Sequence, residues 1–292
     1  MERVKRTKGE RILYIVVFTI LAIYSLFILY HFYFLLQLAT KGTAVEYDKA
    51  VMNDTLAIWS KDFTLKHFLA AFSALTDDYG NTFLGMTFNS VWFSIGSMVI
   101  SLFFESAVTY VVCKYNFRGR TLLYNLVIFR LMLPIVGSLP SAYRIYKAAG
   151  LLNSPRILVT AMDALTGANF LIMYSFYKGI SWDYAEAAFI DGANHAKVYF
   201  SIMLPMALPA ISVLFVTGFI SHWNEYMAIS IYMPLMPTLA YGLYVYESNM
   251  KYLGNQPVYF AGVLLAVIPC LVLFCIFQNT IMQTVHLGGI KG

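Results

Sequence analysis

The segment that decides the architecture reads SWDYAEAAFIDGANHAKVYFSIMLP, from Ser181 to Pro205. Ser181 or Asp183 can cap a helix whose strongest formers are the alanines and the glutamate that follow. Gly192 then permits a sharp turn into a second amphipathic stretch. Pro205 and Pro209 are expected to redirect the chain after that stretch, because proline disrupts a helix interior. The segment is therefore predicted to form a helix–turn–helix hairpin, with long apolar runs on both sides.

The composition around this hairpin is that of a membrane protein. Of the 292 residues, 60% are apolar and 12% are charged, and the mean hydropathy is +0.67. A soluble domain carries about 25% charged residues, twice this share. The low charge excludes a soluble enzyme, a disordered chain and a nucleic-acid binder, whose basic surface needs far more Lys and Arg. We therefore expect the lipid bilayer, and no nucleic acid, as the surroundings of this chain.

Six apolar runs predict an all-α membrane protein with six transmembrane helices, since a bilayer needs about 20 mostly apolar residues per helix. The predicted spans cover residues 12–38, 87–113, 122–143, 157–177, 208–233 and 258–282. Pro134, Gly137 and Pro140 are expected to break the third span near its outer end. The first run is too long for a secretory signal and lacks a small-residue cleavage site, so it is expected to remain in the protein. Residues 1–292 are interpreted as one transmembrane domain.

Basic residues predict the orientation of these spans, because the cytoplasmic side is richer in Lys and Arg. Five of them precede the first span, at Arg3, Lys5, Arg6, Lys8 and Arg11. With six spans, both termini then lie in the cytoplasm, together with the hairpin 181–205 and the tail 283–292. The extracytoplasmic segment 40–86 has mixed charge and is expected to be a small amphipathic element.

The hairpin resembles the EAA motif of ABC-importer permeases. It matches in Glu186-Ala187-Ala188, then Gly192 after three residues, then Ile202-x-Leu204-Pro205 after nine more. Further landmarks resemble the carbohydrate-uptake branch, in particular the smaller permease subunit of maltose-type importers. These landmarks are Asn89-Ser90, Tyr115–Arg120, Gly150–Ser154, Ile190–Ala193, Trp223–Tyr226 and the C-terminal Gly288–Gly292. The first helix departs from the family, since it lacks the proline often found near its outer end.

This resemblance implies the type I ABC-importer permease architecture and a multi-pass protein of the bacterial cytoplasmic membrane. The implied partners are a second, homologous permease, two cytoplasmic ATPase subunits and an extracytoplasmic solute-binding protein that delivers an oligosaccharide. The chain is then not an enzyme and needs no cofactor, because the partner ATPases bind ATP.

The resemblance also implies roles for single residues of the hairpin and the tail. Glu186 would be the charged contact with the ATPase, Gly192 the turn, and Leu204-Pro205 the anchor to the membrane. The full set of ATPase-coupling residues would be Glu186, Ala187, Ala188, Asp191, Gly192, Ile202, Leu204 and Pro205. In the tail, Gly288, Gly289 and Lys291 would reach between the ATPases.

Charged residues within the predicted spans are candidates for the substrate pathway, because a charge in the bilayer must pair or face a cavity. Arg130 either pairs with Glu105 on the preceding helix or, with Arg144, forms a positive lane suited to an acidic sugar. The combination Trp223-Asn224-Glu225-Tyr226 offers the stacking and hydrogen-bonding groups that bind sugars. The partner permease is the alternative place for the main sugar site.

Other classes of protein lack their expected patterns in this sequence. A secondary transporter would need an inverted repeat with broken helices, and none is visible. The histidines and cysteines show no metal spacing, and no clustered acids or histidines indicate catalytic residues. Within the favoured class, a non-sugar solute is the alternative cargo, since the hairpin motif reports the ATPase partner and not the cargo.

Overall fold

The computed structural model describes residues 8–53, 55, 63–77, 79–133, 137–163, 167–253 and 255–288. Within these ranges the secondary structure is helical, apart from one isolated bridge between Thr76 and Thr82. The chain divides into two compact units, Met1–Leu75 with Tyr246–Leu265, and Thr76–Val245 with Ala266–Gly292.

The first unit begins with a long apolar helix, α1 (Lys8–Ala39), followed by the short helices α2 (Ala44–Met52) and α3 (Lys66–Ala74). Thr43 caps α2 by accepting a hydrogen bond from the Glu46 amide at 3.1 Å. The Glu46 carboxylate in turn accepts from the Gly42 amide at 3.1 Å, so the two residues cap the helix reciprocally. The segment 40–86, predicted to be a small amphipathic element, thus contains two short helices, of which α2 has a side-chain cap.

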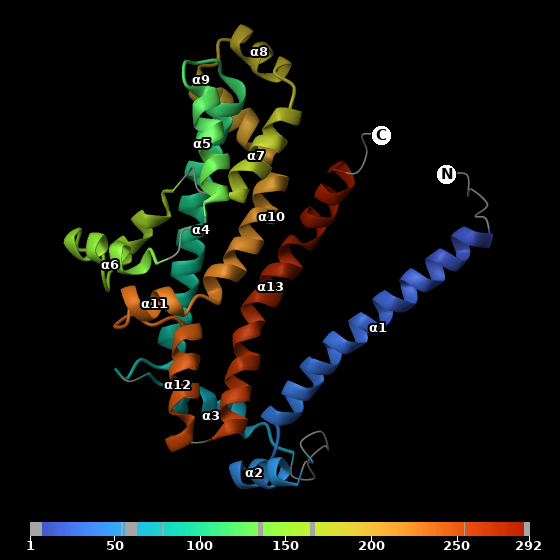
Figure 1. Ribbon diagram of the computed structural model, residues 1–292, viewed down its shortest axis with the longest axis vertical. Helices are drawn as coiled ribbons and strands as arrows, with labels where there is room; N and C mark the ends of the chain where they lie inside the picture. Colours follow the sequence, from blue (N-terminus) through green and yellow to red (C-terminus); the bar gives the residue numbers. More distant parts are fainter. Residues whose placement is uncertain are drawn as a thin grey trace. The chain divides into compact units, whose positions relative to one another are not determined.

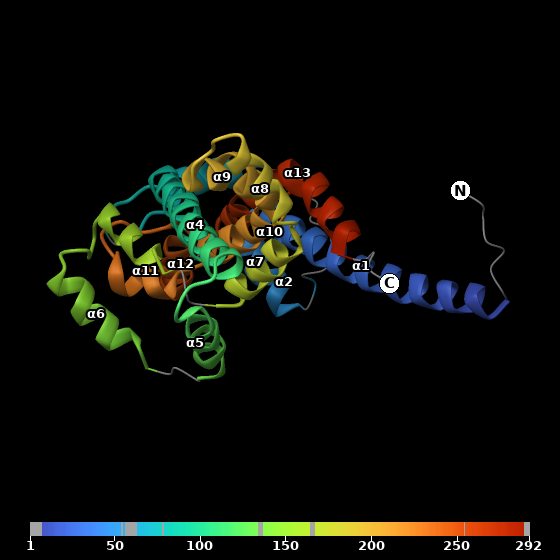
Figure 2. The same ribbon diagram turned by 90° about the horizontal axis from the view of Figure 1, so that it is seen from above.

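The second unit is organised around one central helix, α4 (Phe83–Lys114). The helices α7 (Ala168–Gly179) and α10 (Leu204–Trp223) pack along α4 (Figures 1 and 2). Small polar side chains make the buried stripe of α4, at Ser90, Ser94, Ser97, Ser106 and Thr109. Small residues let membrane helices approach closely, which explains why serine recurs at this spacing.

The remaining elements of the chain are shorter, except for the last helix. They are α5 (Arg120–Met132), α6 (Leu139–Ala148), η1 (Pro155–Ala161), α8 (Asp183–Ile190), α9 (His195–Val198), η2 (Tyr199–Met203), α11 (Met227–Tyr232), α12 (Leu239–Leu253) and α13 (Gln256–Gly288).

Four helical stretches in the described part of the chain are long and apolar enough to cross a membrane. They are Lys8–Ala39, Phe83–Lys114, His195–Trp223 and Gln256–Thr280. They contain or overlap the predicted first, second, fifth and sixth spans. The connection between the predicted fifth and sixth spans is mostly the helix α12.

The predicted third and fourth spans are not continuous helices. In the third, α5 ends at Met132 and α6 begins at Leu139, so the predicted break near its outer end is confirmed. Gly137 has a φ of +78°, which favours glycine, and Pro140 lies in the first turn of α6, where proline is tolerated. Pro134 lies outside the described residues. In the fourth, the 3₁₀ helix η1 ends at Ala161 and α7 starts at Ala168.

Candidate functional site

The hairpin lies at the end of the second unit where α4 ends (Figure 1). Its first arm is α8 and its second begins with α9, as the sequence predicts. Between them, Gly192 has a φ of +80°, and the Ala193 amide donates to the Ala188 carbonyl at 2.9 Å. A Cβ atom at Gly192 would meet nothing within 4 Å, so glycine is required here for its backbone conformation and not for space.

The two sides of α8 differ in exposure. Ala185 and Ala188 are buried against the rest of the unit, whereas Glu186, Ala187 and Asp191 are exposed. Ile190 is 86% exposed at the tip, next to the turn. Ile190 and the neighbouring exposed carboxylates offer an apolar and a charged group side by side at the surface of the hairpin. Ile190 belongs to a quoted motif, but sequence reasoning did not select it as a contact residue.

The second arm continues into the membrane helix without a break, which corrects the prediction that Pro205 and Pro209 redirect the chain. His195–Trp223 is a single helical stretch of 29 residues. The π turn η2 precedes Pro205, and within it the Leu204 amide bonds to the Tyr199 carbonyl five residues earlier. Pro205 lies in the first turn of α10, and Pro209 is accommodated inside that helix. The wider π turn rearranges the backbone bonding just before the first proline, so the helix continues.

Side chains from the end of α4 hold the base of the hairpin. The hydroxyl of Tyr115 is hydrogen-bonded to Nδ1 of His195 at 2.9 Å, and its ring makes an edge contact with Trp182. The ammonium group of Lys114 donates to the carbonyl of Ile180, just before α8. Both arms of the hairpin are therefore fastened to one helix end.

A second, buried set of hydroxyl groups lies below this base. Ser106 of α4 bonds to the hydroxyl of Tyr177 at 2.6 Å and accepts from Tyr199 at 3.1 Å. Tyr177 lies near the end of α7, just before the first arm, and Tyr199 belongs to the second arm. The central helix is thus hydrogen-bonded to the end of α7, which leads into the hairpin, and to the second arm, through residues that the sequence analysis did not single out.

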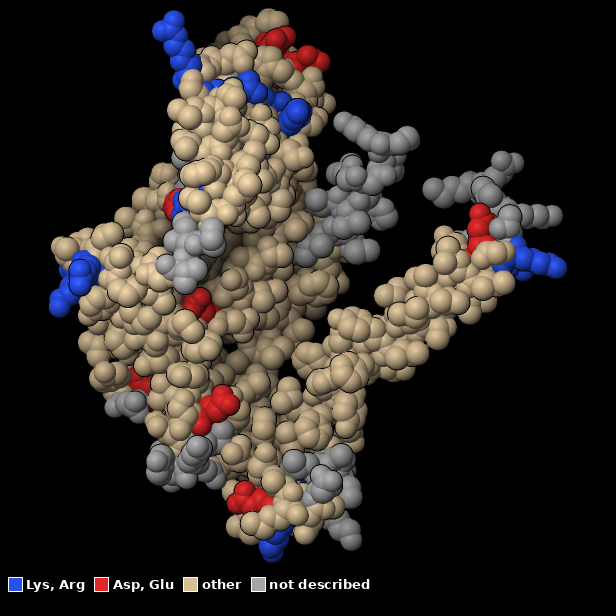
Figure 3. Space-filling view, in the orientation of Figure 1, with Lys and Arg blue, Asp and Glu red and all other residues tan. Residues whose placement is uncertain are grey.

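The other coupling candidates occupy the second arm and the tail. Ile202 and Leu204 are half-buried, and Pro205 is exposed. Gly288 ends α13, whereas Gly289 and Lys291 lie outside the described residues. Lys and Arg side chains gather at the hairpin end of the second unit, while much of the bundle wall below is uncharged on the face in view (Figure 3).

The four consecutive residues predicted to bind sugar do not face one site. Trp223 is 3% exposed, and its indole N–H donates to the Ala266 carbonyl at 3.1 Å, so it belongs to the core. Asn224 donates to the Ile220 carbonyl of its own helix at 2.8 Å. Tyr226 stacks on Tyr244 with ring centroids 4.7 Å apart.

Glu225 is the member of this group that lines a cavity, of about 220 Å³. Its carboxylate accepts from the Ala228 amide at 2.8 Å, at the start of α11. The cavity also contains the side chains of His222, Thr160 and Ser97 and the rings of Tyr146 and Tyr232. It combines aromatic faces with hydroxyl, imidazole and carboxylate groups, and it is smaller than the roughly 300 Å³ at which pockets for drug-sized ligands begin.

The motifs Gly150–Ser154 and Asn89-Ser90, to which the sequence analysis gave no role, make hydrogen bonds to the segment beside this cavity. Asn153, with a φ of +48°, donates its amide to the Tyr232 carbonyl at 3.0 Å and accepts from the Leu235 amide at 2.9 Å. Asn89 donates to the Pro237 carbonyl at 3.0 Å. The segment that follows α11 is therefore held from two sides.

Arg130 pairs with Asp163 and not with Glu105. Its guanidinium makes two contacts with the Asp163 carboxylate, at 3.1 and 3.3 Å, and both side chains are nearly half exposed. Glu105 is buried on the side of α4 that faces Asn169 and Phe170 of α7. Arg144 is exposed on a separate helix, α6.

These features define a helical, multi-pass membrane protein with an exposed hairpin at one end. Residues 106–285, more than half of the chain, match the family described as "Binding-protein-dependent transport system inner membrane component", and the chain belongs to this family. It is therefore a multi-pass inner-membrane protein of a binding-protein-dependent transport system.

Several relatives are named as sugar permeases. The diacetylchitobiose uptake system permease NgcG of Streptomyces coelicolor is 26% identical over 211 residues, which are 70% of this chain and 68% of that protein. The polygalacturonan/rhamnogalacturonan permease YtcP of Bacillus subtilis is 28% identical, over 70% of this chain and 75% of that protein. The resemblance to carbohydrate-uptake permeases is thereby confirmed.

The fold also matches a solved structure. A chain of a bacterial ABC transporter that imports the acidic polysaccharide alginate superimposes with a TM-score of 0.75 at 22% identity. The match covers 95% of this chain and 99% of that one, so the permease fold extends over nearly the whole sequence.

Proposed function

We propose that this chain is one permease subunit of an ABC importer that moves an oligosaccharide into the cytoplasm. The observation that carries the proposal is the exposed hairpin, with Glu186 and Ile190 at its surface and both arms fastened to the end of α4. A rigid, exposed hairpin can transmit movement of a bound ATPase to the bundle. ATP binding then favours one of two arrangements of the membrane helices.

The proposed membrane arrangement has six crossings, with both termini and the hairpin in the cytoplasm. The third crossing is formed by α5 with the segment up to α6, and the fourth by η1 with α7. Non-helical backbone at membrane depth is tolerated where it is buried in protein or lines a water-filled cavity. Residues 1–292 then work as one permease domain.

The proposed partners are two ATPase subunits, a second, homologous permease and an extracytoplasmic solute-binding protein. ATP hydrolysis belongs to the ATPases, so this chain is not itself an enzyme and needs no cofactor. Its coupling surface consists of Glu186, Ala187, Ala188, Asp191 and Gly192, with Ile202, Leu204 and Pro205 anchoring the second arm. Gly288, Gly289 and Lys291 are proposed to reach between the ATPases.

The cargo is proposed to be an oligosaccharide because the relatives' names include diacetylchitobiose and polygalacturonan. A sugar ring fits the chemistry of the cavity around Glu225, since aromatic faces and hydroxyl groups bind sugars. Arg130 supports an acidic cargo less than the sequence indicates, because Asp163 neutralises it.

A co-purification and uptake experiment tests the coupling role. The complete transporter, with its binding protein, is expressed with wild-type permease or with Glu186→Ala/Ile190→Asp, and the permease is isolated with its ATPases. We expect the variant to insert normally, to retain little ATPase and to lose uptake of a labelled oligosaccharide. Normal ATPase retention together with normal uptake would overturn the proposal.

A further inference from the structure

Glu105 is a buried acid within α4, a helix long and apolar enough to cross a membrane. Its side chain is only 3% exposed. The carboxylate accepts hydrogen bonds from the side chain of Asn169 and from the backbone N–H of Phe170. Its Oε2 atom has no hydrogen-bond partner in the part of the chain that the structure describes. An acid at this depth is costly, so its contacts with α7 must offset the cost.

These contacts reach the first turn of α7. The first four backbone N–H groups of an α-helix have no partner within the helix, and together they form its positive end. The residue before α7 is Gly167, which has no side chain to cap the helix. Glu105 therefore supplies, from another helix, the carboxylate that α7 does not have nearby in the chain. Because α7 begins inside the predicted fourth span, water does not replace a missing partner there.

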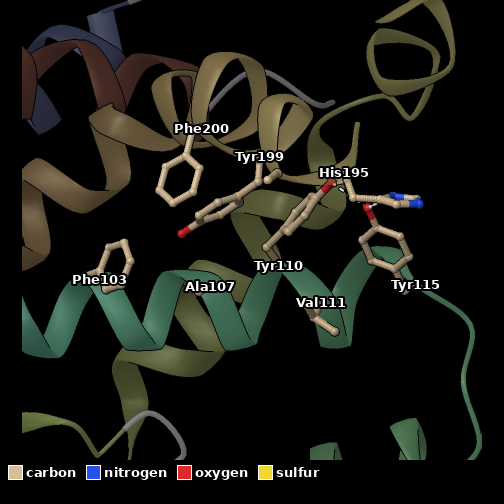
Figure 4. Close-up of a pocket in the computed structure, with 9 residues that line it drawn as sticks. Phe103, Ala107, Tyr110, Val111, Tyr115, His195, Tyr199 and Phe200 are labelled. Atoms are coloured by element: carbon tan, nitrogen blue, oxygen red, sulfur yellow. Dashed lines mark hydrogen bonds between the residues drawn. The ribbon is translucent and has the colours of Figure 1, made fainter. Parts of the chain in front are cut away.

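The far end of α7 and the hairpin are held by the same helix. Ser106, next to Glu105, is hydrogen-bonded to the hydroxyl of Tyr177 near the end of α7, at 2.6 Å. Immediately after α4, Tyr115 is hydrogen-bonded to His195 in the second arm of the hairpin (Figure 4). The central helix thus holds α7 at its start and near its end, and then the hairpin that follows.

The charge near this cap is compensated. Asp163 acts on Glu105 electrostatically. Its own partner is Arg130, at 3.1 Å. The guanidinium group of Arg130 therefore offsets a like charge that would otherwise oppose a carboxylate cap on α7.

We propose that Glu105 is a positioning residue for coupling, which caps α7 and keeps that helix aligned with α4. The inference rests on the proposed function, in which the hairpin contacts an ATPase. Glu105 touches neither the ATPase nor the cargo and acts through α7, the helix that leads into the hairpin. With the cap in place, the hairpin, α7 and α4 move as one packed unit. Without it, the first turn of α7 should fray, and part of each hairpin movement should be lost.

Hydrogen exchange tests the cap in the absence of ATP and sugar. The complete transporter in nanodiscs is compared with its Glu105→Ala and Glu105→Gln variants, by mass spectrometry with fragmentation that resolves single amides. We expect the Phe170 amide to exchange roughly tenfold faster in Glu105→Ala, because a hydrogen bond to a charged group is lost. Glu105→Gln should be intermediate, since it keeps an acceptor oxygen without the charge.

A matched control and the size of the glutamine side chain make this test decisive. Ser94→Ala also removes a fully buried polar group from α4, one without a hydrogen-bond partner among the described residues, and should exchange as the wild type does. Glu105→Gln leaves no cavity and decides the question by itself where the alanine variant does not insert. Unchanged exchange at Phe170 would overturn the proposal. Faster exchange spread evenly over α4 and α7 would also overturn it, because it indicates a general loss of packing.

A second measurement separates positioning from the proposed function. Uptake of a labelled oligosaccharide and ATP hydrolysis are followed in the same vesicles. In Glu105→Ala we expect a normal amount of bound ATPase but less uptake per ATP hydrolysed, with partial recovery in Glu105→Gln. Unchanged uptake per ATP, together with faster exchange at Phe170, would overturn the role in coupling. Absence of oligosaccharide uptake in the wild type would contradict the proposed function and the coupling role with it, whereas the exchange result decides the cap in either case.

Discussion

The hydroxyl of Tyr115 lies 2.9 Å from Nδ1 of His195, which joins the residue after α4 to the first residue of α9. A side-chain hydrogen bond contributes about 0.5–1.5 kcal/mol net, enough to change the population of a docked hairpin by roughly three- to tenfold. The bond thus connects the central helix of the bundle directly to the proposed ATPase contact.

Removing this hydroxyl should weaken coupling without disturbing insertion. Tyr115→Phe keeps the ring contact with Trp182 but loses the bond to His195. We expect oligosaccharide uptake to fall about three- to tenfold at equal membrane abundance. Tyr79→Phe, at an exposed tyrosine outside the hairpin, is the matched control. Equal uptake in the two variants would show that the bond has no part in coupling.

The turn residue is predicted to be sensitive to side-chain type. Gly192→Leu forces a branched residue into a positive φ and should cost about 1–2 kcal/mol, so uptake should drop severely. Gly192→Asn should be milder, because asparagine tolerates this conformation. Gly179→Leu is the control, since its Cβ also meets nothing within 4 Å and its φ is not positive. If Leu and Asn at position 192 behaved alike in the uptake assay, backbone conformation would not be the reason for glycine.

The exposed isoleucine at the hairpin tip should be a main apolar contact with the ATPase. Ile190→Asp should lower the amount of ATPase that co-purifies by tenfold or more, because a buried carboxylate without a partner is strongly unfavourable. Ile190→Leu, which keeps the size and polarity, should retain the ATPase. Retention of the ATPase by the aspartate variant would exclude a buried role for this side chain.

Gly218 sets the distance between α10 and α4. A side chain at this position would collide with the flexible end of Met98. Gly218→Ala should be tolerated because Met98 can move, whereas Gly218→Leu should lower stability by about 1–3 kcal/mol. Thermal unfolding in detergent measures this loss, and Met98→Ala in the Gly218→Leu background should restore part of it. Absence of any rescue would mean that the two residues do not share the interface.

The ion pair Arg130–Asp163 should behave as one unit in transport. Arg130→Gln and Asp163→Asn each leave a charge in the bilayer region without its partner, which should reduce uptake of neutral and carboxylated oligosaccharides alike. The double variant should recover activity toward both sugars. Selective loss of the carboxylated sugar in Arg130→Gln and in the double variant would instead assign Arg130 to recognition of acidic cargo.

The hairpin was predictable because local signals agreed. A capping residue and alanines in the first arm, a glycine at the turn and an amphipathic stretch after it specify the hairpin without distant contacts. The pairing of Arg130 was not predictable, because helix order indicated Glu105 as the neighbour. The breaks in the third and fourth spans place the end of α5 beside Asp163 instead.

The role of the four residues 223–226 was only partly predictable, for a geometric reason. The helix α10 ends at Trp223, so Trp223 still packs in the core, whereas Glu225 lies in the short segment between α10 and α11 and lines the cavity. The hydrogen bonds of Asn153 to Tyr232 and Leu235 join residues that lie more than 70 positions apart in the chain. The only signal in the sequence was the residue type, because asparagine tolerates the left-handed backbone conformation that Asn153 adopts.

The π turn at Tyr199–Met203 has a mechanical consequence. It makes the second arm of the hairpin and the following membrane helix one rod of 29 residues, about 43 Å long at 1.5 Å per residue. One end of this rod carries the contact to Tyr115, and the other ends two residues before Glu225. Tilting such a rod by about 10° about one end moves the other by roughly 7 Å. A modest push at the ATPase side would therefore displace one wall of the cavity by about the width of a sugar ring, with no relay of intermediate residues.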